Sequence, residues 1–196
     1  MKENKSSSWI FEKDKINQYA WWNNFLNKEE CKKIILIGNK YKLHEGTISN
    51  TRQENLAVRN SKINFLYPGN ETQWLFQRLT DVIKDLNNKY FNFDIIGFTE
   101  GIQFSKYKAP KGGYIKHVDS GYGFQVRKLS ISIQLSDSKS YEGGDVSIYN
   151  GEKGVKLSRE QGSLSVFPSY TLHDVSRLTK GERYSLVCWI NGPQFK

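Results

Sequence analysis

Cysteine, proline and long apolar runs are scarce in this sequence of 196 residues, which has two cysteines and four prolines. Cys31 and Cys188 lie far apart without CxxC spacing, which excludes a disulfide scaffold and predicts buried, inert thiols. No apolar run approaches the ~18 residues of a membrane span, and no apolar segment follows the Lys- and Ser-rich start. We therefore expect a soluble, cytoplasmic protein without a membrane partner.

Aromatic residues and positive charge are plentiful. Phe, Trp and Tyr make up 14% of the chain, and the formal net charge is +9. The charge is concentrated in Gly101–Ser130, which has six Lys or Arg and one Asp. Such a stretch favours anionic small molecules, acidic peptides or nucleic acid, although a solvated lysine-rich surface explains it equally well. No RNP, zinc-finger or helix-turn-helix signature accompanies it.

Helical spacing of apolar residues is confined to the first half of the chain. Residues 1–20 show no periodicity and predict a partly ordered arm. A first helix is expected from the N-cap Asn27, because Glu29 and Glu30 favour a first turn. A second is expected after Asn70 or Thr72. Its apolar face is formed by Trp74, Leu75, Leu79, Val82, Ile83, Leu86 and Tyr90.

After Phe91 the pattern changes to short strands. Apolar residues alternate with Ser and Gln over Leu129–Ser136, the period of a strand with one face in the core. Further strands are predicted at Gly101–Lys108, Asp145–Tyr149, Ser163–Phe167 and Tyr184–Ile190. Helices followed by strands predict a mainly β fold, a β-sandwich or jelly roll buttressed by two or three N-terminal helices. One domain is expected over 21–196, with helical support in 21–92 and a jelly-roll core in 93–193.

The histidines indicate a metal site. His117 and Asp119 are two residues apart, so an extended segment puts both side chains on one face. His173 follows the predicted strand that ends at Phe167. Two imidazoles and one carboxylate leave three open positions on a metal, an arrangement that suits non-haem Fe(II). Taken alone, an H-x-D pair is a weak signal. His44 lies in the polar region before the core and is interpreted as a structural or surface residue.

Arg183 and Ser185 share one face of the last predicted strand. The other face of that strand is apolar and consists of Tyr184, Leu186, Cys188 and Ile190. A guanidinium beside a hydroxyl can clamp a carboxylate. An inward-facing arginine requires such an anionic partner, because burying an unpaired charge is costly.

Four stretches of the sequence, taken in their order along the chain, resemble the Fe(II)- and 2-oxoglutarate-dependent dioxygenases. Within that family the resemblance is to the prolyl 4-hydroxylase-like branch, the PKHD-type hydroxylases. The resemblance covers about residues 63–193. Its stretches are residues 112–119 (GGYIKHVD), 141–149 (YEGGDVSIY), 162–175 (GSLSVFPSYTLHDV) and 180–190 (KGERYSLVCWI).

The resemblance implies a double-stranded β-helix, the cupin-like jelly roll, and hydroxylation of a C–H bond with decarboxylation of 2-oxoglutarate to succinate and CO2. It also implies Fe(II), O2 and 2-oxoglutarate, and raises ascorbate as an accessory factor. Metal ligands would be His117, Asp119 and His173. Arg183 would hold the distal carboxylate of 2-oxoglutarate, helped by Tyr107 and Ser185.

Three positions have two interpretations each. Gln134 stands where relatives commonly carry a second tyrosine that contacts the cosubstrate, so it is either a cosubstrate contact or an ordinary strand residue. Tyr107 is favoured as a cosubstrate contact over a packing aromatic. Tyr114 is favoured as a packing or turn residue over one that lines the substrate entrance. Gly121 and Gly123 make Ser120–Val126 a candidate lid.

The favoured substrate is a prolyl residue of a protein or peptide. Alternatives are the same chemistry on a nucleic acid or free small molecule, a non-catalytic β-sandwich binding module, and a zinc hydrolase. The zinc hydrolase lacks a general-base glutamate in an HExxH arrangement. A nucleic-acid dealkylase would show a further arginine after Arg183, which is absent from the sequence. Oligomeric state is not indicated.

Overall fold

A computed structural model describes residues 17–47, 55–120 and 126–194. The predicted N-terminal arm and the candidate lid at 120–126 lie largely outside the described residues.

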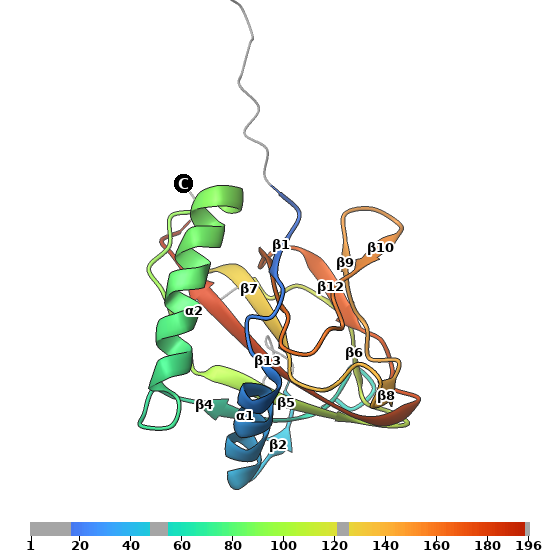
Figure 1. The fold of residues 1–196 in the computed structure, drawn as a ribbon. Coiled ribbons are helices and arrows are strands. Elements are labelled where there is room, and N and C mark those ends of the chain that lie inside the picture. Colours follow the sequence, from blue (N-terminus) through green and yellow to red (C-terminus); the bar gives the residue numbers. More distant parts are fainter. Residues whose placement is uncertain (1–16, 48–54, 121–125, 195–196) are drawn as a thin grey trace, which may run out of the picture.

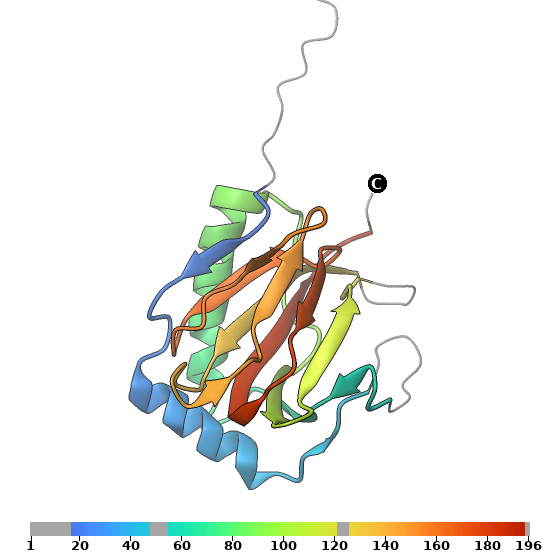
Figure 2. The same cartoon turned by 90° about the vertical axis from the view of Figure 1, so that its right-hand side faces the viewer.

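Two facing sheets form the body of the molecule (Figures 1 and 2). Within the described ranges, the larger sheet has eight strands. In spatial order they are β1 (Ala20–Trp22), β11 (Leu164–Pro168), β7 (Arg127–Gln134), β13 (Lys180–Asn191), β5 (Ile102–Lys108), β4 (Lys62–Leu66) and β2 (His44–Glu45), with β8 (Tyr141–Glu142) also paired to β13. The smaller sheet contains β10 (Gly154–Lys156), β9 (Val146–Tyr149), β12 (Leu172–Val175), β6 (Gly113–His117) and β3 (Arg59–Asn60).

Helices cover the face of the larger sheet that points away from the smaller one (Figure 1). Helix α1 (Lys28–Lys40) begins with a capping box, in which Asn27 Oδ1 accepts from the Glu30 N–H and a Glu30 carboxylate oxygen accepts from the Asn27 N–H, both at 2.9 Å. Gly38 allows α1 to approach the sheet, because a Cβ there would lie 2.5 Å from the Phe104 ring. The predicted helix at Asn27 is confirmed.

Helix α2 (Gln73–Leu86) follows the N-cap Thr72, one of the two residues predicted to precede it. The helix continues into the π-helix η1 (Asn87–Phe91). The prediction that Tyr90 belongs to the apolar face is wrong. The wider turn rotates the chain by one position, so Phe91 is buried and Tyr90 is 40% exposed.

Strict alternation divides the central strands into two faces. The side chains that pack beneath the helices in the main core include Ile102, Phe104, Leu129, Ile131, Ile133, Leu186, Cys188 and Ile190. The intervening residues of β7 and β13 point toward the smaller sheet. This arrangement, a mainly β jelly roll with two α-helices, confirms the predicted fold class.

Several strands were not predicted. The region 21–92, expected to be helical support, also contributes β1, β2, β3 and β4, which pair with strands of both sheets. These segments are two to five residues long, too short for a period of two to be distinguished from chance.

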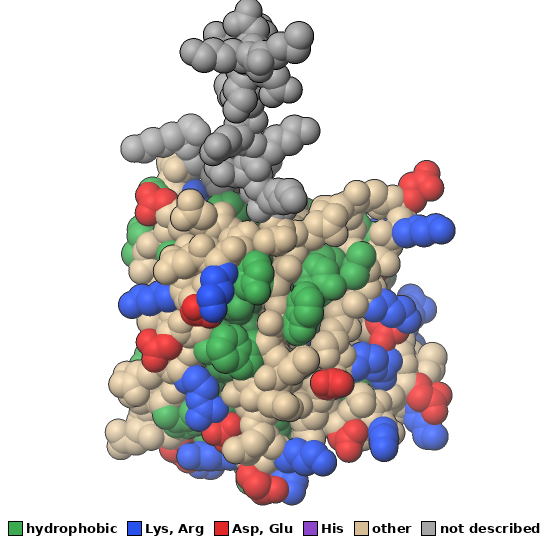
Figure 3. Space-filling view, turned by 45° about the horizontal axis from the view of Figure 1, so that its top comes forward, with side chains coloured by type: hydrophobic (Ala, Val, Ile, Leu, Met, Phe, Trp, Pro, Cys, Tyr) green, Lys and Arg blue, Asp and Glu red, His purple; other side chains and the backbone are tan. Residues whose placement is uncertain are grey.

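Figure 3 shows one face of the molecule, on which hydrophobic side chains gather near the centre while acidic and basic side chains are interspersed around the periphery. Among the described residues, the helices are all too short and too polar to cross a bilayer. Both cysteines are free and buried, as predicted. Burial, followed by the charge of Glu30, raises the pKa of the Cys31 thiol to about 11, and burial raises the pKa of Cys188 as well.

Candidate metal centre and cavity

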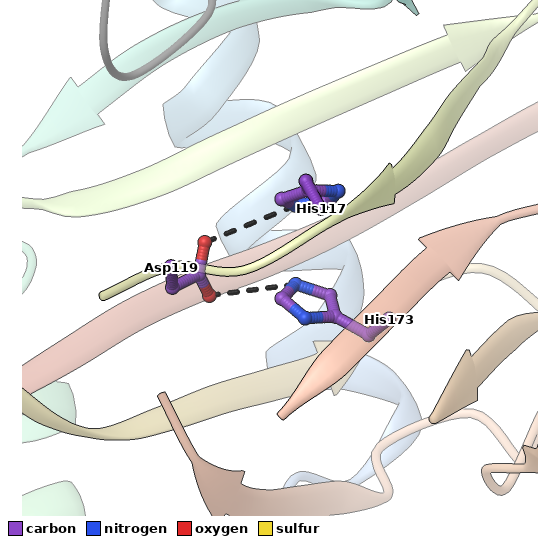
Figure 4. Close-up of side chains that lie close together, drawn as sticks. All are labelled: His117, Asp119 and His173. Carbon is purple, nitrogen blue, oxygen red and sulfur yellow. Dashed lines mark ion pairs between the residues drawn. The ribbon is translucent and has the colours of Figure 1, made fainter. Parts of the chain in front are cut away.

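His117, Asp119 and His173 come together between the two sheets (Figure 4). His117 ends β6, Asp119 follows two residues later, and His173 lies on the neighbouring strand β12, directly opposite His117. One ligand atom from each residue can be chosen so that all lie within 4.8 Å of one another. The three side chains that the sequence nominated are therefore brought to one point.

Both imidazoles are oriented by backbone carbonyls. The Nδ1 atom of His117 lies 2.8 Å from the Ile115 carbonyl oxygen, and that of His173 lies 2.9 Å from the Thr171 carbonyl oxygen. A carbonyl only accepts, so each Nδ1 carries a proton, and Nε2 is the ring nitrogen that faces Asp119. These Nε2 atoms lie 3.8 and 3.5 Å from the Asp119 carboxylate oxygens. This second layer of contacts is the arrangement found around metal-binding histidines.

Asp119 is held by its neighbours on the larger sheet. The Ser130 hydroxyl donates to Asp119 Oδ2 at 2.7 Å. The backbone N–H of Asp119 donates to the Ser169 carbonyl at 3.0 Å, as does that of Ser120. Ser130 lies on β7 and Ser169 directly follows β11, so the larger sheet positions a ligand of the smaller one.

Protonation in this cluster favours binding of a cation. Burial, then the neighbouring His173, lowers the pKa of His117 to about 4. Burial disfavours the charged form of Asp119, but His173, His117 and the Ser130 hydrogen bond outweigh it and hold the pKa of that carboxyl below its usual value. At neutral pH the cluster thus offers a neutral imidazole at His117 and an anionic carboxylate at Asp119.

A cavity of about 450 Å³ opens beside the cluster and is lined by all three of its residues. Arg183 also lines it and is 1% exposed, with its guanidinium carbon 5.3 Å from the centroid of the Tyr107 ring. Arg183 Nε has no hydrogen-bond partner among the described residues. Arg183 also has no ion pair within the described residues, where the ion-paired arginines are Arg78, Arg127 and Arg159.

The stem of Arg183 packs against Gly144, the second residue of the Gly143–Gly144 pair. Gly144 has a φ of +67°, and a Cβ there would lie 3.1 Å from Arg183 Cδ and 2.6 Å from Leu178 Cδ1. Glycine is therefore required by both conformation and space.

Of the remaining predicted residues, some line the cavity and others do not. Tyr107, Tyr114 and Ser185 line the cavity, and each is buried. Gln134 is also buried, opposite Ser185 in the β7–β13 register, but it is not among the cavity-lining residues. Its Oε1 atom has no partner within the described residues. His44 is exposed on β2, away from the cluster.

Sequence reasoning missed several cavity residues. Ser130 could have been found, because it lies on the polar side of the alternating stretch that precedes Gln134. Arg59 could not, since β3 has two residues and no readable period. Arg127 and Glu100 also line the cavity and form an ion pair, with Nε to Oε1 at 2.8 Å. Their sequence separation gives no sign of that contact.

The site therefore combines two binding capacities in one cavity. Two imidazole nitrogens and a carboxylate form a ligand set for a first-row divalent metal. A buried guanidinium with an unused N–H is suited to a carboxylate, since its five donors match carboxylate geometry. Together they fit a metal and an acidic small molecule bound side by side.

A model of the 2OG-Fe(II) oxygenase superfamily matches residues 102–191. A PKHD-type hydroxylase of Prochlorococcus marinus (strain MIT 9515) is 31% identical over 176 residues, which cover 84% of this chain and 74% of the relative. Another, from the SARG strain of the same species, is 38% identical over 111 residues, covering 56% of this chain. The match spans about half (48%) of the length of that second relative.

Solved structures share the fold. A prolyl hydroxylase from Trichoplax adhaerens, in complex with a hypoxia inducible factor peptide fragment, has a TM-score of 0.76 at 21% identity and covers 89% of this chain and 84% of its own. A Pseudomonas putida prolyl-4-hydroxylase has a TM-score of 0.72 at 18% identity, covering 90% of this chain and 94% of its own. At these identities the likeness concerns architecture.

Proposed function

The chain belongs to the PKHD-type branch of the 2OG-Fe(II) oxygenase superfamily, and from this premise we propose that it is an Fe(II)- and 2-oxoglutarate-dependent dioxygenase that hydroxylates a C–H bond. The observation that carries the proposal is the meeting of His117, Asp119 and His173 in a cavity that also contains the buried Arg183. The balanced reaction converts substrate C–H, O2 and 2-oxoglutarate into substrate C–OH, succinate and CO2.

The residues present fit the metal and the cosubstrate. His117 and His173 each present Nε2, because Nδ1 is hydrogen-bonded to a carbonyl, and Asp119 supplies the carboxylate. This donor set suits Fe(II). The unpaired Nε of Arg183 suits the distal carboxylate of 2-oxoglutarate. When bound, the ferrous ion and the 2-oxo acid supply the oxygen-activating chemistry.

The protein's own contributions are binding, orientation and exclusion of water. Ser130 holds the Asp119 carboxylate in place, and carbonyls hold both imidazoles. Arg183 and Tyr107 form the buried end of the cavity, where Ser185 adds a hydroxyl. Fixed groups of this kind cost no reorganisation when ligand binds. A cosubstrate contact by Gln134 stays a prediction, since Gln134 is paired with Ser185 but is not among the residues that line the cavity.

The substrate we propose is a prolyl residue of a protein or peptide. Support comes from the PKHD-type relatives and from the shared fold with prolyl hydroxylases. A nucleic-acid substrate is less favoured, since Lys106 and Arg127 of the basic stretch are already paired with Glu182 and Glu100.

Turnover with candidate substrates tests the proposal. Proline-containing peptides, single-stranded oligonucleotides and free proline are incubated aerobically with the protein, Fe(II), 2-oxoglutarate and ascorbate. We expect a mass increase of about 16 Da, one oxygen atom, on a peptide proline and an equal amount of succinate. The control is His173→Ala, which should give neither product. Oxidised oligonucleotide would reassign the substrate, and succinate formation equal in His173→Ala and wild type would refute the proposed enzyme.

A further inference from the structure

Three side chains form a stack that reaches the candidate metal centre from outside it. The ring centroids of Tyr114 and His117 lie 3.6 Å apart with an interplanar angle of 18°. The guanidinium carbon of Arg59 lies over the Tyr114 ring at 4.9 Å from its centroid. The Tyr114 ring thus covers one face of the His117 imidazole, and the Arg59 guanidinium in turn packs against the Tyr114 ring.

A β-bulge in β6 brings Tyr114 and His117 to the same side. His173 pairs with His117 and Val175 pairs with Tyr114, so two steps along β12 oppose three steps along β6. In a regular strand, residues three positions apart point to opposite faces. The extra residue cancels that alternation, and Ile115 and Lys116 are consecutively exposed at the bulge. Bulges beside active sites commonly redirect a side chain in this way.

Arg59 is fixed against Tyr114 by contacts of its own. The two residues are direct cross-strand partners between β3 and β6. Arg59 is 5% exposed and donates to the Ser61 hydroxyl and the Thr47 carbonyl, both at 3.0 Å. Among the described residues it has no ion pair with a carboxylate. A buried cation held by neutral acceptors is costly, and the electron-rich face of Tyr114 offsets part of that cost.

The two histidines of the cluster differ in how they are supported. His173 is 6% exposed and lies on a strand with neighbours on both sides. His117 ends its strand, and its side chain is 16% exposed. Its carbonyl contact restrains one ring nitrogen, while rotation about that contact is opposed by the Tyr114 ring.

From this geometry we propose that Tyr114 and Arg59 are positioning residues for the metal site, acting through His117. Tyr114 fixes the plane of the imidazole, and Arg59 fixes Tyr114 while tying it to the backbone at Thr47. The inference rests on the proposed function, because it assigns His117 as a metal ligand. Contacts of this kind around a ligand typically change metal affinity by about 10- to 100-fold.

Anaerobic calorimetric titration with Co(II) alone, paired with the visible spectrum of bound Co(II), tests the assignment. Tyr114→Leu should bind Co(II) about 10- to 100-fold more weakly and alter the spectrum. Tyr114→Phe keeps the ring and should restore most of the affinity, and Arg59→Met should fall between the two. The matched control is Lys116→Met. Lys116 makes a similar contact with the Tyr149 ring at 4.0 Å, but the ring stacked on His117 is that of Tyr114, so this variant should bind Co(II) as wild type does.

The outcomes separate this inference from the proposed function. Folded wild-type protein that binds no Co(II) would refute the metal site itself. Wild-type binding that is lost in His173→Ala, but is unchanged in both Tyr114→Leu and Arg59→Met, would overturn the positioning role alone. Should Tyr114→Leu fail to fold, Arg59→Met decides: unchanged Co(II) affinity and spectrum, with an altered KM only, would make Arg59 a substrate contact and refute the proposal.

Discussion

The two faces of the larger sheet are built from the same strands and do opposite things. On the helix side, β7 and β13 present Leu129, Ile133 and Leu186, all fully buried in the main core. On the cavity side, the alternate residues include Ser130, Arg183 and Ser185, also buried but polar. The comparison teaches that burial alone does not distinguish a stabilising residue from a binding residue. What marks Arg183 as a binding residue is a buried Nε that lines the cavity and has no partner among the described residues.

The largest expected effect is on the helix side. Ile133→Ala should lower the free energy of unfolding by about 2–5 kcal/mol, because it leaves a cavity in a packed core. Chemical denaturation measures this change. The 2-oxoglutarate affinity of the folded variant should match wild type, and a large loss of affinity there would break the distinction between the faces.

For Arg183→Met, on the cavity side, we expect the opposite result, a loss of 2-oxoglutarate affinity without a loss of stability. Removing the guanidinium should weaken 2-oxoglutarate binding by about 1.5–3 kcal/mol, the range for hydrogen bonds to charged groups. The free energy of unfolding without ligand should rise, since a buried unpaired charge is removed. Calorimetry and denaturation measure the two quantities. Unchanged cosubstrate affinity would refute the role of Arg183.

A smaller effect is expected for Ser130→Ala, which removes the hydroxyl that orients Asp119. Metal affinity should fall by roughly 10-fold, at the low end for such supporting contacts, with little loss of stability. Ser132→Ala is the matched control, because Ser132 lines the same cavity from the same strand without a contact to Asp119. Equal metal affinities in the two variants would contradict the assigned role of Ser130.

The smallest effect concerns pH and the helix layer. The Arg78 hydrogen bond holds the pKa of Glu30 below its usual value, despite burial. Because the pKa of Glu30 is lower in the folded state, its interaction stabilises the protein fully above the unfolded-state pKa of 4.5. This stability is lost as the pH falls through the folded-state pKa. We expect the free energy of unfolding to fall by about 0.5–1 kcal/mol over this range because of Glu30. The Glu30→Gln variant should not show this fall. Denaturation between pH 3 and 6 measures it, and parallel curves would contradict the assignment.

The sequence predicts the central strands because their alternation is long and strict. Leu129–Ser136 shows apolar and polar residues in turn over a full strand, and the helix at Asn27 carries its own capping signal. The same logic explains why Arg183 and Ser185 were found on one face. His117, Asp119 and His173 were nominated by spacing and by resemblance, and they do meet in one cluster.

Other features depend on partners that are distant in sequence. The strands β2, β3 and β8 have two residues each and are defined by pairing alone. The bulge between Tyr114 and His117 exists because β12 is one residue shorter over that stretch. The π-turn that exposes Tyr90 likewise has no local signal. These features reflect tertiary contacts, which override local pattern.

The central claim is that one cavity holds both the metal and the 2-oxo acid. Anaerobic titration of the Fe(II)-loaded protein with 2-oxoglutarate tests it most directly, because chelation produces a visible metal-to-ligand charge-transfer band without any substrate. We predict a saturable band that is lost in His173→Ala and shifted to higher 2-oxoglutarate concentration in Arg183→Met. The absence of a band in folded wild-type protein would contradict the account and favour a binding module.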